Sequence, residues 1–176
     1  MKLVISEPVP LGAEEVLHLL RDDMPALVPY LYDIDRIEVT ERREEGDVVH
    51  IVNLWFGDMA KVPGPLRKFA KPELFSWTDY ASWSSAKRQA SWRLEPRVGA
   101  RAFECHGTTT LVDADEGARI EMDINIDIYP ENIPGIPKFI AKRLLPQIER
   151  AIEKQITPNL RNLAVSIRRY AEAMKA

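Results

Sequence analysis

Hydrophobic and polar residues alternate along much of the chain between residues 34 and 128. The clearest case is residues 118–128, in which Ile120, Met122, Ile124 and Ile126 occupy every second position and acidic or amide residues stand between them. Because successive side chains of a strand point to opposite faces, this spacing predicts a strand with one apolar face and one acidic face. Six segments with this period, joined mostly by hairpin turns, predict an antiparallel sheet.

Helical spacing appears at both ends of the chain. Residues 2–7 predict a first strand, residues 11–22 a helix, and residues 24–32 a second short helix or a broken turn. After residue 137 the apolar residues follow steps of three, four or seven, and an unbroken helix from there to Lys175 would be about 57 Å long. Pro146 and Pro158 each remove an amide donor, so we expect kinks or breaks near both.

A segment rich in proline and glycine, residues 130–137, separates the last strand from this helix. We expect it to turn the chain back, so that the helix lies on the apolar side of the sheet. Seven strands at about 4.8 Å spacing form a sheet nearly 30 Å wide, whereas a helix with its side chains is about 10 Å thick. A curved sheet around one helix therefore leaves room for a pocket unless large side chains fill it.

This order of elements resembles the helix-grip fold of the START-like superfamily, which includes Bet v 1-like proteins and polyketide cyclases and aromatases. The resemblance covers essentially the whole chain and is carried by its architecture and by "PVPLGAEEVLHLL", "SWRLEP" and "YPENIPGIPKFIAKRLLP". It implies a single α+β domain over residues 1–176, with a curved seven-stranded antiparallel sheet wrapped around a long C-terminal helix. Two short helices would lie between strands 1 and 2, and a deep pocket would hold a hydrophobic or amphipathic small molecule.

The hairpin around Ser84 and Ser85 allows a register to be predicted. If these residues form the turn, Trp77 pairs with Trp92, and Asp79 and Arg88 become diagonal neighbours on the apolar face. Such a pair would be a polar anchor for a ligand, or a structural ion pair that neutralises itself. The two tryptophans would stack on a ring-bearing ligand or simply fill the core.

From the face of each strand and the first turns of the last helix, we predict a set of ligand-lining residues. They are Phe75, Trp77, Asp79, Arg88, Trp92, Phe103, Ile124, Ile126, Ile140 and Leu144.

Composition narrows the function classes. A net charge of −3 and a sequence pI near 5.7 argue against a nucleic-acid binder. The single cysteine, Cys105, has no disulfide partner within the chain, and "MKLVISEPVP" lacks a secretory signal, so we expect a cytoplasmic protein. The three histidines follow no metal-binding spacing, and the chain has no nucleotide-binding motif, so we expect neither a metal nor a cofactor.

Residues 61–71 mix basic residues with Leu66 and Phe69. This mixture is compatible with transient contact with an anionic membrane surface, or with a solvated loop that tucks its apolar residues under the sheet. The resemblance places the loop near the mouth of the cavity.

Three functions remain open on the sequence. The first is binding or transport of a lipid, polyketide or aromatic molecule. The second is a cyclase or dehydratase that would use Asp79 and Arg88 as acid/base and anion-stabilising groups. The third is a structural or interaction role in which side chains fill the interior. The sequence specifies neither the ligand nor an oligomeric state.

Overall fold

The computed structural model describes residues 1–61, 72–132 and 137–175, with the side chains of all these residues except 74 and 151–159. The main elements in chain order are β1 (Lys2–Val9), α1 (Ala13–Asp22), η1 (Met24–Tyr30), β2 (Ile34–Glu45), β3 (Val48–Gly57), β4 (Ser76–Ser84), β5 (Gln89–Pro96), β6 (Phe103–Ala114), β7 (Gly117–Ile128) and α3 (Lys138–Lys175). Three short 3₁₀ turns are η2 (Met59–Lys61), η3 (Pro72–Phe75) and η4 (Pro130–Asn132).

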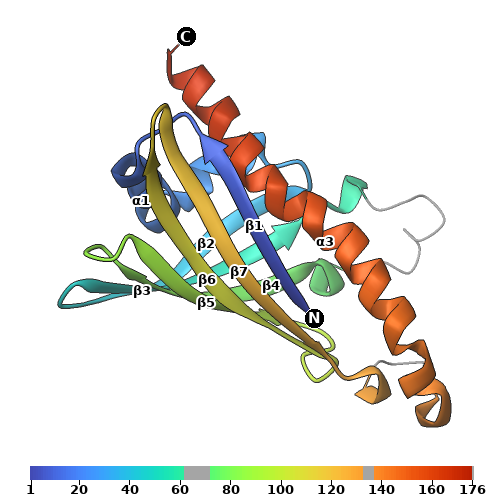
Figure 1. Ribbon diagram of the computed structural model, residues 1–176. Helices are drawn as coiled ribbons and strands as arrows, with labels where there is room; N and C mark the ends of the chain where they lie inside the picture. Colours follow the sequence, from blue (N-terminus) through green and yellow to red (C-terminus); the bar gives the residue numbers. More distant parts are fainter. Residues whose placement is uncertain (62–71, 133–136, 176) are drawn as a thin grey trace.

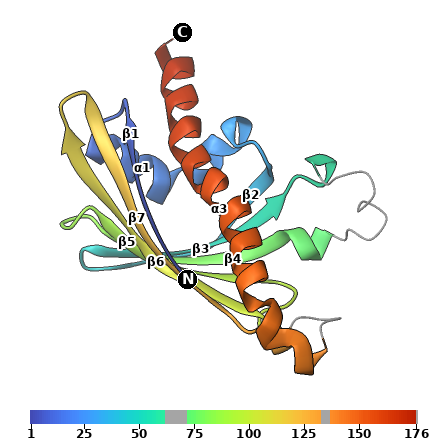
Figure 2. The ribbon, with the colours of Figure 1, turned by 45° about the vertical axis from the view of Figure 1, so that its right-hand side comes forward.

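The strands form one antiparallel seven-stranded sheet in the order β1-β7-β6-β5-β4-β3-β2. The first strand pairs with the last, so the N-terminus lies beside β7, and β1 and β2 are the two edges. The sheet is strongly curved, and α3 runs across its concave side (Figure 1). In Figure 2 the two halves of the sheet diverge like the arms of a V, with α3 across the opening. The predicted helix-grip fold is confirmed.

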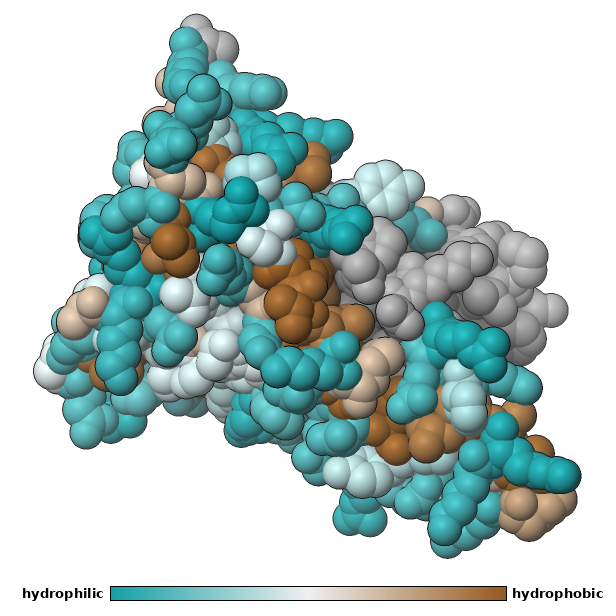
Figure 3. Space-filling model, viewed as in Figure 1, coloured by the Kyte–Doolittle hydropathy of each residue, from teal (hydrophilic) through white to brown (hydrophobic). Residues whose placement is uncertain are grey.

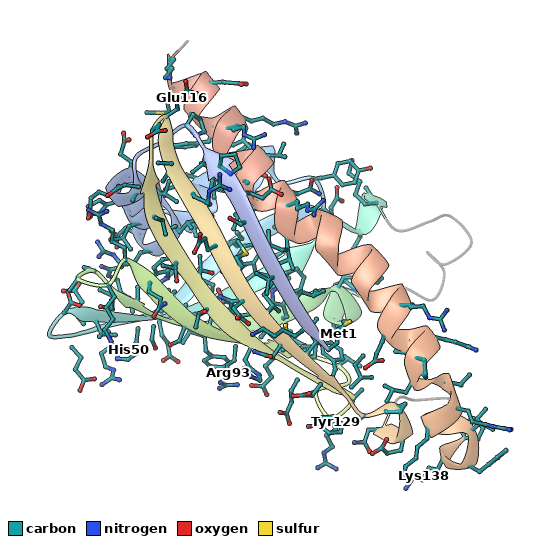
Figure 4. The ribbon with its side chains drawn as sticks, viewed as in Figure 1. Met1, His50, Arg93, Glu116, Tyr129 and Lys138 are labelled. Atoms are coloured by element: carbon teal, nitrogen blue, oxygen red, sulfur yellow. The ribbon has the colours of Figure 1, made fainter. Side chains whose placement is uncertain are left out.

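The alternation read from the sequence separates the two faces of the sheet. On β7 the apolar residues are buried on the concave face, with Ile120, Ile124 and Ile126 each 1% exposed. Glu121 and Asp127, at the alternate positions of the same strand, are exposed, as expected for the convex face. Figure 4 shows the labelled side chains of the convex face, His50 and Arg93, on the side of the sheet away from α3.

One end of the concave face is closed by α1 and η1. Val16, Leu17 and Leu27 are at most 1% exposed. Arg21 of α1 donates a 2.6 Å hydrogen bond to Ser85 Oγ in the turn between β4 and β5, which places α1 over that end of the sheet. The closed hydrophobic core therefore lies where β4 ends and β5 begins.

The helix α3 is continuous from Lys138 to Lys175, so it does not break at either proline, whereas a kink near each proline, the other predicted outcome, stays a prediction. Each proline removes one amide donor, but the turns on both sides of it stay helical. Its described contacts are chiefly with β1, η1, η4 and β7. Ser166 donates a 3.0 Å hydrogen bond to the carbonyl of Tyr30, and Tyr170 meets the Tyr30 ring edge-on at 5.9 Å. The C-terminal half of α3 is thus anchored beside η1 and β1.

Candidate functional site

The register of the β4–β5 hairpin differs from the prediction. Ala81 pairs with Trp92 and Trp77 with Pro96, and the turn spans residues 85–88. Asp47, from the turn between β2 and β3, holds this longer turn, since its carboxylate accepts bonds from Ser84 Oγ (2.6 Å) and the amide of Ala86 (3.0 Å). The shift is an even number of residues, so the strand residues predicted for the concave face are still there.

The observed register places Arg88 in the turn, outside the site. It lies in the turn with a φ of 48°, and its guanidinium donates to Glu14 (2.7 Å) and Asp113 (2.6 Å). The predicted pairing of Arg88 with Asp79 is therefore wrong. Arg88 ties the hairpin turn to α1 and to the end of β6 instead.

The side chains at the end of the concave face far from α1 are more exposed to solvent than those beside α1. Near the closed end, Val49, Trp83 and Ala90 are 7%, 5% and 0% exposed. At the other end, the row of directly paired residues formed by Trp55, Trp77 and Pro96 is only half-buried. We call this end, at Trp55, Trp77, Asp79, Trp92 and Leu94, the open end.

Tryptophans form the apolar wall of the open end. Trp55 and Trp77 are cross-strand partners whose rings stack with centroids 5.8 Å apart and planes 17° from parallel. Trp92 donates from Nε1 to Thr109 Oγ1 at 3.0 Å and covers Gly107, where an added Cβ would come within 2.8 Å of Trp92 Cζ2. Trp77 therefore stacks on Trp55 and is not the cross-strand partner of Trp92 that the predicted register made it.

A buried polar group interrupts this wall. Asp79 is 8% exposed and lies directly opposite Asn53, which is 3% exposed. Burial raises the pKa of Asp79 to about 6, while the donor groups of Asn53 and Trp55 favour the charged carboxylate and oppose the shift. Although the indole of Trp55 is close enough to have this effect, its Nε1 does not reach hydrogen-bond geometry. Among the described residues, neither Trp55 Nε1 nor Asn53 Oδ1 has a partner.

Sequence reasoning missed Asn53 and left Trp55 unplaced. A signal for Asn53 was present, because it is a lone amide in the apolar run "VVHIVNLWF" of β3. Its position opposite Asp79 depends on the pairing of β3 with β4, which local spacing does not reveal.

The other predicted lining residues are dispersed. Phe75 lies in η3, outside β4, and is 38% exposed. Ile124 and Ile126 are closed in the core, whereas Phe103 at the start of β6 and Ile140 and Leu144 on α3 are half-buried.

The predicted membrane-contact loop, residues 61–71, lies outside the described residues except for Lys61, whose Nζ is 4.5 Å from the centre of the Tyr32 ring.

Hydrophobic side chains also reach the surface on the side of α3. Figure 3 shows them in the centre of the view and again toward the lower right, where α3 begins. Phe139, in the first turn of α3, is 85% exposed. Of the helices in the described part of the chain, none is long and apolar enough to cross a membrane. Over the same part, no group of three or more His, Cys, Asp or Glu residues could hold a metal ion.

Comparison with known families decides where the chain belongs. Residues 8–170 match the family described as "Protein of unknown function (DUF2505)". The chain belongs to this family. No curated protein matches its sequence.

Solved structures of low sequence identity share its fold. A protein from Thermus thermophilus is 17% identical with a TM-score of 0.62, over 95% of this chain and 97% of that one. The Zhui aromatase/cyclase from a Streptomyces species is 15% identical with a TM-score of 0.61, over 99% and 94%. Norcoclaurine synthase from Thalictrum flavum is 13% identical with a TM-score of 0.58, over 97% and 86%. These likenesses show that the fold is START-like.

Proposed function

We propose that this protein binds a small molecule with a largely hydrophobic body at the open end of the concave face, between β3–β5 and α3. Carriage or presentation of such a molecule would be its role in the cell. The single cysteine supports a cytoplasmic setting for this role.

One observation carries the proposal: α3 is anchored over β1 and β7, while the tryptophan wall lies on β3, β4 and β5. Half-buried tryptophans present a large apolar area whose removal from water is favourable, at roughly 25 cal/mol per Å². A concave, mostly apolar wall with a few buried polar groups is the usual composition of a small-molecule site. An aromatase/cyclase and a norcoclaurine synthase share this fold, and this likeness supports a ring-bearing molecule as the occupant.

A second candidate is an enzyme that works on the molecule held there. The pKa of Asp79, raised to about 6 by burial, suits a group that gives or takes a proton near neutral pH. Such an enzyme would use Asp79 without Arg88, because the Arg88 guanidinium is bonded to Glu14 and Asp113. It predicts that Asp79→Asn abolishes turnover of a bound substrate but leaves binding measurable, whereas a carrier shows no turnover to lose.

Tryptophan fluorescence tests binding directly, because all four tryptophans, Trp55, Trp77, Trp83 and Trp92, lie on the concave face. Titration with decanol and with naphthol should change the emission saturably and raise the melting temperature. Absence of both effects across the two probes would contradict the proposal.

Two neighbouring substitutions on β5 supply a matched control. Leu94 is half-buried on the concave face opposite Asp79, and Glu95 lies on the convex face. Leu94→Trp should fill the site and remove the titration signal, whereas Glu95→Trp should leave the affinity unchanged. Equal affinities in the two variants would place the binding site elsewhere.

A further inference from the structure

Three polar groups lie together in the apolar wall of the open end: the side chains of Asn53, Trp55 and Asp79. Asn53 and Asp79 are both more than nine-tenths buried, at 3% and 8% exposure. Asn53 Oδ1 and Trp55 Nε1 are buried without a hydrogen-bond partner among the described residues. A buried polar atom without a partner is unfavourable, so an occupant that bonds to both atoms would relieve that cost.

The chemistry of these atoms restricts the occupant. Trp55 Nε1 only donates, while Asn53 Oδ1 and an ionised Asp79 only accept. A hydroxyl group matches this set, since its oxygen accepts from the indole and its proton goes to Asp79 or to the amide oxygen. A carboxylate can accept from the indole but has no proton to give, and it would bring a second negative charge beside Asp79.

No positive charge on the described wall offsets that repulsion. The neighbours of Asp79 in the sheet are Asn53 on β3, Leu94 on β5, and Trp77 and Ala81 along β4. Each of these four is uncharged. Arg88 is engaged by Glu14 and Asp113 at the other end of the hairpin.

We infer, on the basis of the proposed function, that this site selects molecules that end in a hydroxyl group over molecules of the same shape that end in a carboxylate. The ligand class is then a hydrophobic alcohol or a phenol, not a fatty or aromatic acid. Asn53, Trp55 and Asp79 determine this choice, and the stacked tryptophans hold the hydrophobic body.

Two matched pairs of probes test the inference by isothermal titration calorimetry: decanol against decanoate, and naphthol against naphthoate. At about pH 8 both acids and Asp79 are ionised while both hydroxyl compounds are neutral. The wild-type protein should bind the hydroxyl member of each pair at least about tenfold more tightly.

Substitutions then assign the preference to the named groups. Asp79→Asn removes the negative charge at almost unchanged volume. It should reduce the ratio of the affinities for the hydroxyl compound and the acid severalfold within each pair, mainly because the acid binds more tightly. Trp55→Phe keeps an aromatic ring but removes the Nε1–H donor, and should therefore weaken binding of the hydroxyl compounds. Asp127→Asn, on the exposed convex face of β7, is the matched control and should leave both ratios unchanged.

The outcomes separate this inference from the proposed function. Equal affinity for alcohol and acid overturns the hydroxyl preference, and a ratio that Asp79→Asn leaves untouched overturns the assignment of that preference to Asp79. Binding itself stands in both cases. Failure of all four probes to bind contradicts both.

Discussion

The indole rings of Trp55 and Trp77 stack face to face across β3 and β4, with centroids 5.8 Å apart and planes 17° from parallel. Both rings stay half-buried at the end of the concave face that α1 does not close. A stacked pair that remains partly exposed is favourably placed to receive a third ring or an alkyl chain.

Trp77→Ala should lower the affinity for naphthol by at least about tenfold, because it removes one ring of the stack. It should also destabilise the protein by roughly 1–3 kcal/mol, since a half-buried aromatic side chain is lost. Calorimetric titration and urea unfolding measure the two effects. Tyr80→Ala is the matched control, because Tyr80 is the aromatic residue of β4 on the convex face, under the guanidinium of Arg93 at 3.8 Å. A similar loss of affinity in both variants would show that the Trp55–Trp77 stack does not take part in binding.

The buried carboxyl of Asp79 should make stability depend on pH. Its pKa is raised from 3.8 to about 6, so the folded protein holds this proton more tightly than the unfolded chain. The contribution of Asp79 to stability should therefore fall as pH rises from about 4 to about 6 and stay low above that, by a total on the order of 3 kcal/mol. Asp79→Asn should flatten this slope and stabilise the protein above about pH 6. Urea unfolding across this pH range is the measurement, and an unchanged slope in the variant contradicts the assignment.

Gly107 is the point where Trp92 approaches the backbone of β6. A Cβ at this position would collide with the carbonyl oxygen of Asp123 and lie 2.8 Å from Trp92 Cζ2. Gly107→Ala should destabilise the protein by about 2 kcal/mol or more and shift the tryptophan emission, because the indole must move away from Thr109. Thr108→Ala, one residue along on the other face, should cost about 1 kcal/mol or less. Thermal unfolding followed by fluorescence compares them, and equal losses would show that the contact with Trp92 is unimportant.

The two ion pairs of Arg88 should affect stability and not binding. Arg88→Ala releases Glu14 and Asp113, and we expect a small decrease in the urea midpoint that shrinks at high salt. The affinity for decanol should equal that of the wild-type protein. A weaker affinity of this variant for decanol would indicate that Arg88 contributes to the binding site, contrary to its position in the turn.

Cys105 shows how far residue type alone reaches. A lone cysteine in a strand-like run is typical of a core or half-buried thiol, and Cys105 is 8% exposed on the concave face, with its pKa raised to about 11 by burial. Local composition was enough because a small apolar side chain at an alternating position has one favourable place, the buried face.

The hairpin of β4 and β5 shows where such reasoning ends. The faces of Trp77, Asp79 and Trp92 followed from alternation, since a period of two assigns a face whatever the partner strand is. The turn did not follow, because Asp47 of the neighbouring hairpin holds it and thereby decides that Arg88 points outward.

The sequence by itself determined the order of the elements, the two faces of the sheet and the shared face of Trp77 and Trp92, because these depend on the spacing of neighbours along the chain. Only the tertiary structure decided that Asn53 lies opposite Asp79, that Trp55 stacks on Trp77, and that α3 runs unbroken over β1 and β7. These relationships join residues far apart in sequence, and their free energy comes from contacts that form only once the strands have paired and the helix has packed.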